Sequence, residues 1–190
     1  MVHQALQAQN RIVHLRDKAV RADAATRTPK LWLAAAAAED AGDRAFAEEA
    51  FEEARRNWEQ AAKLYDEGAV AATRLRAEQE ALVDFERRYA ELDEEILREY
   101  GGEKWAELYA IMEQARAFSA AGEGDRAAER WRSALEKLPA AWAVAVRARN
   151  LPRFQVLLSE ARMLAGEEHW GQAETKASEA LELEGFRESA

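Results

Sequence analysis

Apolar and charged residues recur along the chain with the spacing of an α-helix. Near the N-terminus, Val2, Leu6, Val13 and Val20 stand at helical intervals, and charged residues lie between them. This pattern predicts one amphipathic helix over residues 2–24. Similar patterns occupy most of the remaining chain and are interrupted by a few turn signals.

Capping and turn residues divide the part of the chain that follows. Thr28 and Pro29 predict a helix start, because the hydroxyl can accept a hydrogen bond from an unpaired amide and proline at the first helical position loses no bond. Gly42 and Asp43 predict a turn between two helices, and Gly68 predicts the end of the resulting hairpin.

Glycines and prolines also divide the second half of the chain. Gly101 and Gly102 predict a turn or hinge, and the Gly-Glu-Gly-Asp stretch at 122–125 predicts a turn inside a second hairpin. Pro139 predicts the start of a short helix, and Pro152 predicts another break. The prediction is therefore one domain over 1–190, with an N-terminal helix at 1–28, hairpins at 29–66, 103–138 and 153–184, a long helix at 69–100 and a short helix at 139–150.

The predicted long helix at 69–100 carries a seven-residue repeat. The repeat consists of Leu75, Leu82, Tyr89 and Ile96, with Phe85 and Leu92 three residues after two of them. Such a seam is typical of a long helix that packs on a partner helix. Glu78 and Glu99 occupy seam positions, so two partners stay open: a helix of the same domain, or a second copy that forms a homo-oligomer through 69–99.

The composition strengthens the helical prediction and excludes several classes of protein. Ala, Glu, Arg and Leu are prominent among 190 residues that include only 3 Pro and 9 Gly, which favours an all-α fold. The formal net charge of −9 argues against general nucleic-acid binding, which needs clustered Lys and Arg.

Targeting signals and cysteines are absent from the sequence. The N-terminus lacks the apolar stretch of a signal peptide, and no segment approaches the roughly 20 apolar residues that cross a bilayer. With 0 Cys, the chain has no disulfide framework and no thiolate metal site. We therefore expect a cytoplasmic, acidic protein that binds neither nucleic acid nor membranes.

The stretch at 113–139 returns downstream in a recognisable form at 159–185. Matching Ala115 with Ala161 gives an offset of 161 − 115 = 46. The same offset pairs Arg116 with Arg162, Ala127 with Ala173, Ala134 with Ala180, Leu135 with Leu181 and Glu136 with Glu182. The chain thus contains an internal repeat.

The repeated unit has a family resemblance. In the first copy its key residues are Ile111, Gln114, Ala115, Phe118, Gly122, Ala127, Trp131, Ala134 and Pro139. This set resembles the tetratricopeptide (TPR) family, whose helix-turn-helix units of about 34 residues follow the pattern W-x2-L-G-x2-Y, A-x3-F and P. A weaker copy carries Leu157, Ala161, Leu164, Ala173 and Ala180. The resemblance implies antiparallel hairpins in an irregular array, because the offset of 46 exceeds the family's unit and the predicted long helix interrupts it.

An earlier copy of the unit can be aligned in two ways. An offset of 122 − 42 = 80 pairs Gly42 with Gly122 and Phe51 with Trp131, whereas an offset of 105 − 32 = 73 pairs Trp58 with Trp131. The two differ by about two helical turns. We prefer the offset of 80, because it places a turn at the glycine of position 42.

The sequence carries no motif that is typical of an enzyme. His3, His14 and His169 are not part of an HExxH motif, so we expect no metal and no cofactor. Glycine-rich phosphate loops are also absent, and runs of acids such as 93–95 are typical of a solvated helix face.

Two arginines are the main candidates for partner binding. Arg116 and Arg162 follow the two matched alanines, and the TPR resemblance implies that both lie on the first-helix face that lines the ligand groove. Two guanidiniums there would bind an acidic peptide or a C-terminal carboxylate. The common alternative is local pairing with Glu113 and Glu160.

Tyr109 and Arg153 complete the candidate binding residues. The aromatic residues of this region are Trp105, Tyr109, Trp131 and Trp142. They predict either a binding cage or, as aromatics at helical spacing more often do, part of the core. Arg153 adds positive charge near Arg147 and Arg149.

The sequence as a whole favours an interaction protein. We expect a non-enzymatic, TPR-like adaptor or scaffold that presents a helical surface to a protein or peptide partner. The alternative is a structural or oligomerising helical accessory, or a domain appended to a larger bacterial protein.

Overall fold

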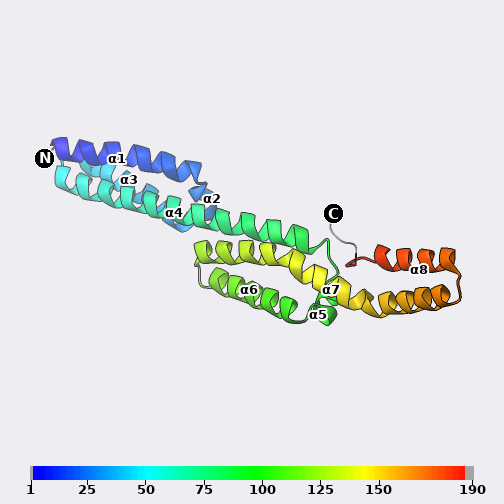
Figure 1. Cartoon of the computed structure of the whole chain (residues 1–190). Coiled ribbons are helices and arrows are strands. Elements are labelled where there is room, and N and C mark those ends of the chain that lie inside the picture. The colour runs from blue at the N-terminus through cyan, green and yellow to red at the C-terminus, as the bar shows by residue number, and fades with distance from the viewer. Residues whose placement is uncertain (1, 187–190) are drawn as a thin grey trace. The chain divides into compact units, whose positions relative to one another are not determined.

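A computed structural model describes residues 2–186, and those residues form α-helices without any β-strand. The helices are α1 (Val2–Arg21), α2 (Ala24–Arg27), α3 (Pro29–Ala47), α4 (Phe51–Tyr89), α5 (Glu94–Tyr100), α6 (Gly102–Ala120), α7 (Gly124–Gly166) and α8 (Trp170–Glu182) (Figure 1). The predicted all-α fold with antiparallel hairpins is therefore confirmed. Where the sequence predicted one domain, the structure divides into two compact units, Met1–Gln79 and Glu80–Ala190, with the boundary inside α4.

The first unit packs α1, α2, α3 and residues 51–79 of α4 around one core. The core is rich in alanine and also contains Ile12, Trp58 and Tyr65. Trp32 packs edge-on against Tyr65 with ring centroids 5.2 Å apart. Small alanines let the helices approach closely, and the large rings fill the remaining space.

The N-terminal helix is confirmed, but its buried face is not the valine stripe. The buried positions of α1 are Ala5, Ala8, Ile12 and Ala19. Val2, Leu6, Val13 and Val20 are 39% to 59% exposed. Most of the inward positions are alanines, because alanine permits a close helix contact that the larger side chains would prevent.

Two glycines that predicted helix breaks instead lie inside helices. α3 runs through Gly42, and a Cβ built there would overlap the indole of Trp58. α4 runs through Gly68, whose carbonyl accepts a hydrogen bond from the Thr28 hydroxyl at 3.3 Å. The predictions of a turn at 42 and a hairpin end at 68 were wrong, because both glycines continue a helix, and at Gly42 the missing side chain provides space for the Trp58 ring. The helix start at Pro29 is confirmed.

Three hairpins share one turn geometry. The first hairpin is α3–α4, the second is α6–α7 and the third is α7–α8, and each turn has three residues. The middle residues are Glu49, Gly122 and Glu168, with φ angles of 62°, 73° and 64°. In every turn the third residue's amide donates to the carbonyl five residues earlier at 2.9 Å. This is a Schellman-type helix end, repeated three times.

The shared turns correct the alignment of the first hairpin. Aligning the starts of α4 and α7 gives 124 − 51 = 73, and the middle turn residues give 122 − 49 = 73. The preferred offset of 80 was wrong, because it rested on a turn at position 42. Buried residues at equivalent places are Gly42, Ala115 and Ala161, then Ala54, Ala127 and Ala173, then Ala61, Ala134 and Ala180.

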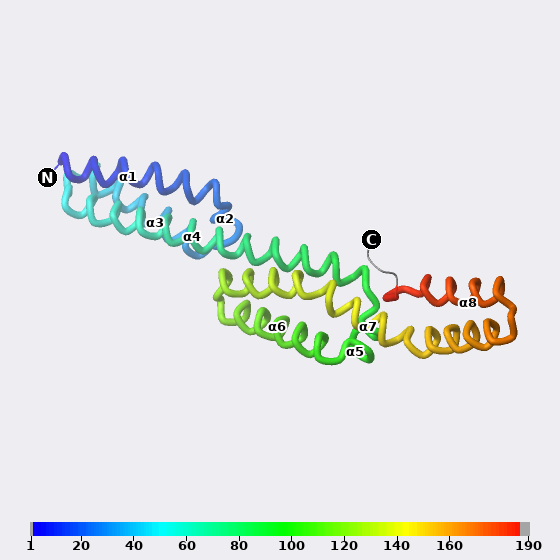
Figure 2. Tube along the Cα trace, viewed as in Figure 1, coloured from blue at the N-terminus to red at the C-terminus, as the bar shows by residue number. Residues whose placement is uncertain are grey.

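Helix ends in the second unit also differ from the prediction. The expected long helix at 69–100 is divided, because α4 ends at Tyr89 and the Asp93 side chain accepts bonds from the amides of Glu95 and Ile96 to begin α5. The expected short helix at 139–150 and the break before 153 are absent, since α7 contains both prolines. Figure 2 shows that α7 bends partway along its length, which is how a helix accommodates interior proline.

α7 consequently belongs to two hairpins. Its first part packs on α6 and its last part packs on α8, while α5 also packs on it. No helix within residues 2–186 combines the length and the apolar character needed to span a bilayer.

Candidate functional site

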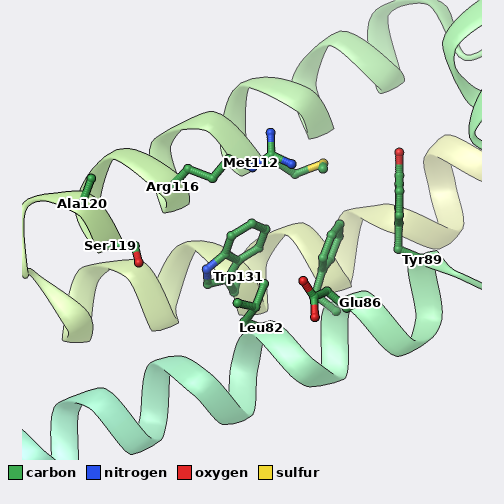
Figure 3. Close-up of a pocket in the computed structure, with 9 residues that line it drawn as sticks. Leu82, Glu86, Tyr89, Met112, Arg116, Ser119, Ala120 and Trp131 are labelled. Carbon is green, nitrogen blue, oxygen red and sulfur yellow. The ribbon is translucent and has the colours of Figure 1, made fainter.

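A pocket of about 480 Å³ lies in the second unit among the end of α4, α6 and the start of α7 (Figure 3). Its lining residues are Leu82, Phe85, Glu86, Tyr89, Met112, Arg116, Ser119, Ala120 and Trp131. Aromatic rings form one side, because Phe85 lies 5.3 Å from both Tyr89 and Trp131 between ring centroids. The pocket thus joins an apolar wall to a few polar groups, as ligand sites do.

The helix packing explains why this space remains open. Ala115 and Ala127 are fully buried and bring α6 and α7 close together. Phe85 of α4 is 2% exposed and packs against Trp131 of α7. The last turn of α6 contributes only the small side chains of Ser119 and Ala120 to the lining, so the volume beside the indole is not filled.

Arg116 and Tyr89 contribute polar groups to the pocket, and each has an acidic neighbour. The Arg116 guanidinium donates to the Glu113 carboxylate at 2.6 Å, and both side chains are about half exposed. Burial and a hydrogen bond with the nearby Glu94 carboxylate raise the pKa of Tyr89 to about 12, although the positive charge of Arg116 opposes this rise. Arg116 therefore lies close enough to Tyr89 to influence its ionisation.

Trp131 carries the unusual polar group of the pocket. Its side chain is 4% exposed, and its indole Nε1 is buried without a hydrogen-bond partner. Figure 3 shows this nitrogen on the side of the ring that faces the Ser119 end of the pocket. Indole nitrogen can only donate, and buried donors without acceptors are rare in folded proteins.

The first hairpin shows how the same donor is satisfied elsewhere. Trp58 is the equivalent of Trp131, since 131 − 58 = 73, and its Nε1 donates to the Asp43 carboxylate at 3.0 Å. The residue equivalent to Asp43 is Arg116, since 116 − 43 = 73. A guanidinium has donors but no acceptor, so position 116 cannot supply the bond that position 43 supplies.

The other predicted binding residues lie away from this pocket. Arg162 and Arg153 are exposed on α7, and Tyr109 is 47% exposed on α6 beside Trp105 at 5.7 Å between ring centroids. Arg116 lines the pocket, whereas the other three predicted binding residues do not. The structure therefore does not bring Arg116 and Arg162 together in it.

The expected local ion pairs are found in one of the two cases. Arg116 pairs with Glu113 as the alternative interpretation predicted. Glu160 instead lies 3.6 Å from the ammonium of Lys176 on α8. Among residues 2–186, groups of three or more His, Asp or Glu side chains that could hold a metal ion are not found.

The sequence did not point to Phe85 and Tyr89 as part of a site. Both were seen only as seam positions of a long helix, and the seam alone does not tell which helix faces them. Trp131 was recognised as a residue of the repeat and as part of either an aromatic binding cage or the core. A comparison of positions 43 and 116 at the correct offset would have revealed the lost acceptor.

Comparisons of this chain with protein-family models, with curated proteins and with solved structures found no match.

Proposed function

We propose that the chain is a non-enzymatic, TPR-like interaction module that presents a helical surface to a peptide or protein partner. The observation that carries this proposal is the pocket beside α6, because α6 is the first helix of the second hairpin and helical pairs of this kind offer grooves for peptides. The proposal includes a cytoplasmic location, which the cysteine-free sequence favours.

The repeated hairpins support the TPR-like part of the proposal. Three turns have the same hydrogen bonds and the same left-handed middle residue. Small residues recur at matching buried places, which sets the close contact between the two helices of each pair. A unit built repeatedly in this way is typical of proteins whose task is recognition.

A selection from a random peptide display library would test the proposal. We expect sequences that bind the wild-type chain by calorimetry, and an Arg116→Glu variant that binds them about tenfold more weakly because a hydrogen-bond donor of the pocket lining is replaced by a carboxylate. Arg132→Glu is the matched control, since Arg132 is exposed on α7 and does not line the pocket. Failure to select any binder of the folded chain would refute the proposal.

Self-association is a second candidate function. Leu75, a residue of the predicted seam, is 41% exposed on α4 and is therefore accessible to another copy. Phe85 and Ile96 are buried, so they are not available to such a contact. Light scattering over a range of protein concentrations decides: a constant monomer mass would exclude self-association, and a Leu75→Glu variant should dissociate any dimer.

A further inference from the structure

We infer that the pocket binds an uncharged peptide segment of the partner, with an apolar side chain inside the pocket and an adjacent main-chain carbonyl accepting a hydrogen bond from Trp131 Nε1. This inference rests on the proposed function and names the chemistry of its ligand. In this arrangement the partner supplies the acceptor that Asp43 supplies to Trp58 in the first hairpin.

The need for an acceptor follows from the two tryptophans. Trp58 and Trp131 occupy equivalent positions, and both are buried. Only Trp58 has a partner for its indole N–H, because residue 43 is an aspartate and residue 116 is an arginine. A buried donor without an acceptor is costly, so a carbonyl delivered at this point is favoured.

The apolar part of the ligand follows from the walls. Leu82, Phe85 and Met112 line the pocket together with the Trp131 ring. A volume of about 480 Å³ accommodates one large apolar side chain together with part of its main chain. Burial of such a side chain against these rings gains the usual free energy of apolar contact.

The charges around the pocket argue for a neutral acceptor. Arg116 and Glu86 line the pocket with opposite charges, and Glu113 already pairs with Arg116. These groups sum to one excess negative charge, which repels a carboxylate. Asp43, the acceptor in the first hairpin, is exposed to water. An acceptor in the pocket would be covered by the bound partner, and burial away from water disfavours a charged group. The acidic peptide expected from the sequence is therefore replaced here by an uncharged segment.

Entry to the donor requires a side chain to move. Trp131 Nε1 is covered in the free protein, and Arg116, the residue equivalent to Asp43, lines the same pocket. The Arg116 side chain is 54% exposed and is held by a single ion pair to Glu113. Because exposed ion pairs contribute little, a ligand can displace this side chain at small cost.

The first experiment follows the indole N–H signals of the 6 tryptophans by ¹⁵N–¹H NMR. N-acetyl-phenylalaninamide is titrated as the neutral probe and N-acetyl-phenylalanine as the carboxylate probe. We expect the amide to move the Trp131 signal downfield with saturation, and the carboxylate to bind several-fold more weakly. An unmoved Trp131 signal, or tighter binding of the carboxylate, would overturn the inference.

Variants then separate the donor from the shape of the pocket. Trp131→Phe keeps an apolar ring and should weaken binding of the amide about fivefold, the amount expected for one hydrogen bond. Trp142→Phe is the matched control, since Trp142 lines a different pocket near Pro139. Circular dichroism checks that each variant is folded, and the wild-type NMR titration does not depend on any variant.

The outcomes also separate this inference from the proposed function. Selected peptides that bind the wild type and Trp131→Phe equally would refute the pocket assignment while leaving the interaction module in place. Binding of the amide at Trp131 together with a failed peptide selection would refute the module and leave the pocket assignment in place.

Discussion

Trp58 and Trp131 occupy equivalent positions in the two units but have different surroundings. Trp58 is 0% exposed, packs on Gly42 and Phe46, and donates its N–H to Asp43. Trp131 is also buried, yet its donor has no acceptor and a pocket lies beside its ring. A repeated unit can thus close completely in one copy and remain open in another, and the difference lies in a few neighbouring residues.

The largest expected effect concerns the closed site around Trp58 in the first hairpin. Gly42→Ala places a methyl group within the Trp58 indole, so the indole must move and the first unit should lose about 2 kcal/mol of unfolding free energy. Denaturant unfolding measures the loss. Ala115→Gly is the converse change at the equivalent position and should cost about 1 kcal/mol through helix propensity, in addition to the cost of removing a buried methyl group. A Gly42→Ala variant as stable as the wild type would show that the first site is not tightly closed.

Removing the acceptor of Trp58 should make the closed site resemble the open one. Asp43→Ala leaves the Trp58 N–H buried without a partner, at a cost of about 1–2 kcal/mol. Asp40→Ala is the control, because it removes an exposed carboxylate from the same helix without touching Trp58. Thermal unfolding of both variants checks the prediction. Equal losses would attribute the effect to charge rather than to the hydrogen bond.

Supplying an acceptor to Trp131 should have the opposite effect. Arg116→Asp copies the first hairpin, and we expect a gain of about 1 kcal/mol in stability together with loss of binding of the amide probe. Arg162→Asp makes the same change in the third hairpin, where Ala177 takes the place of the tryptophan, and should give no gain. Unfolding curves and the NMR titration report the two effects. A gain of equal size in both variants would refute the role of Trp131.

Local signals predicted the helix start at Pro29 and the second-hairpin turn near Gly122, because a proline or glycine there acts on its own backbone. The same logic failed at Gly42, where the reason for glycine is the ring of Trp58 on the next helix. Such a contact depends on the register of two helices, which an amphipathic pattern leaves uncertain by about two turns. Asp93 is a residue type that commonly caps a helix, and it caps α5. The seven-residue repeat instead favoured one continuous helix across this position.

The candidate site was predictable only in part, for a related reason. Arg116 was found because it recurs in the internal repeat. Phe85 and Tyr89 were not, since they come from a helix whose packing partner the sequence does not specify. The open N–H of Trp131 became visible only when the turns fixed the offset of 73 and placed Arg116 opposite Asp43.

Alkaline pH should sharpen the comparison through a tyrosine of the pocket. The folded protein raises the pKa of Tyr89 to about 12, above its ordinary value of 10.0, so the fold favours the neutral phenol. The resulting stability is present below pH 10 and is lost as the pH rises through the folded pKa. The wild type should therefore lose unfolding free energy relative to Tyr89→Phe between pH 10 and about 12.

Tyr65 provides the internal reference for this titration. Burial and its hydrogen bond to the Glu39 carboxylate at 2.8 Å raise its pKa as well, so the first unit also loses stability at alkaline pH. A Tyr65→Phe variant should remove that separate contribution and leave the Tyr89 contribution unchanged, because the two rings belong to different units. Denaturant unfolding at a series of pH values measures both. Parallel curves for the wild type and Tyr89→Phe would show that the pocket does not favour the neutral phenol, and the Tyr89 side of the pocket would then be more hydrated than its lining residues indicate.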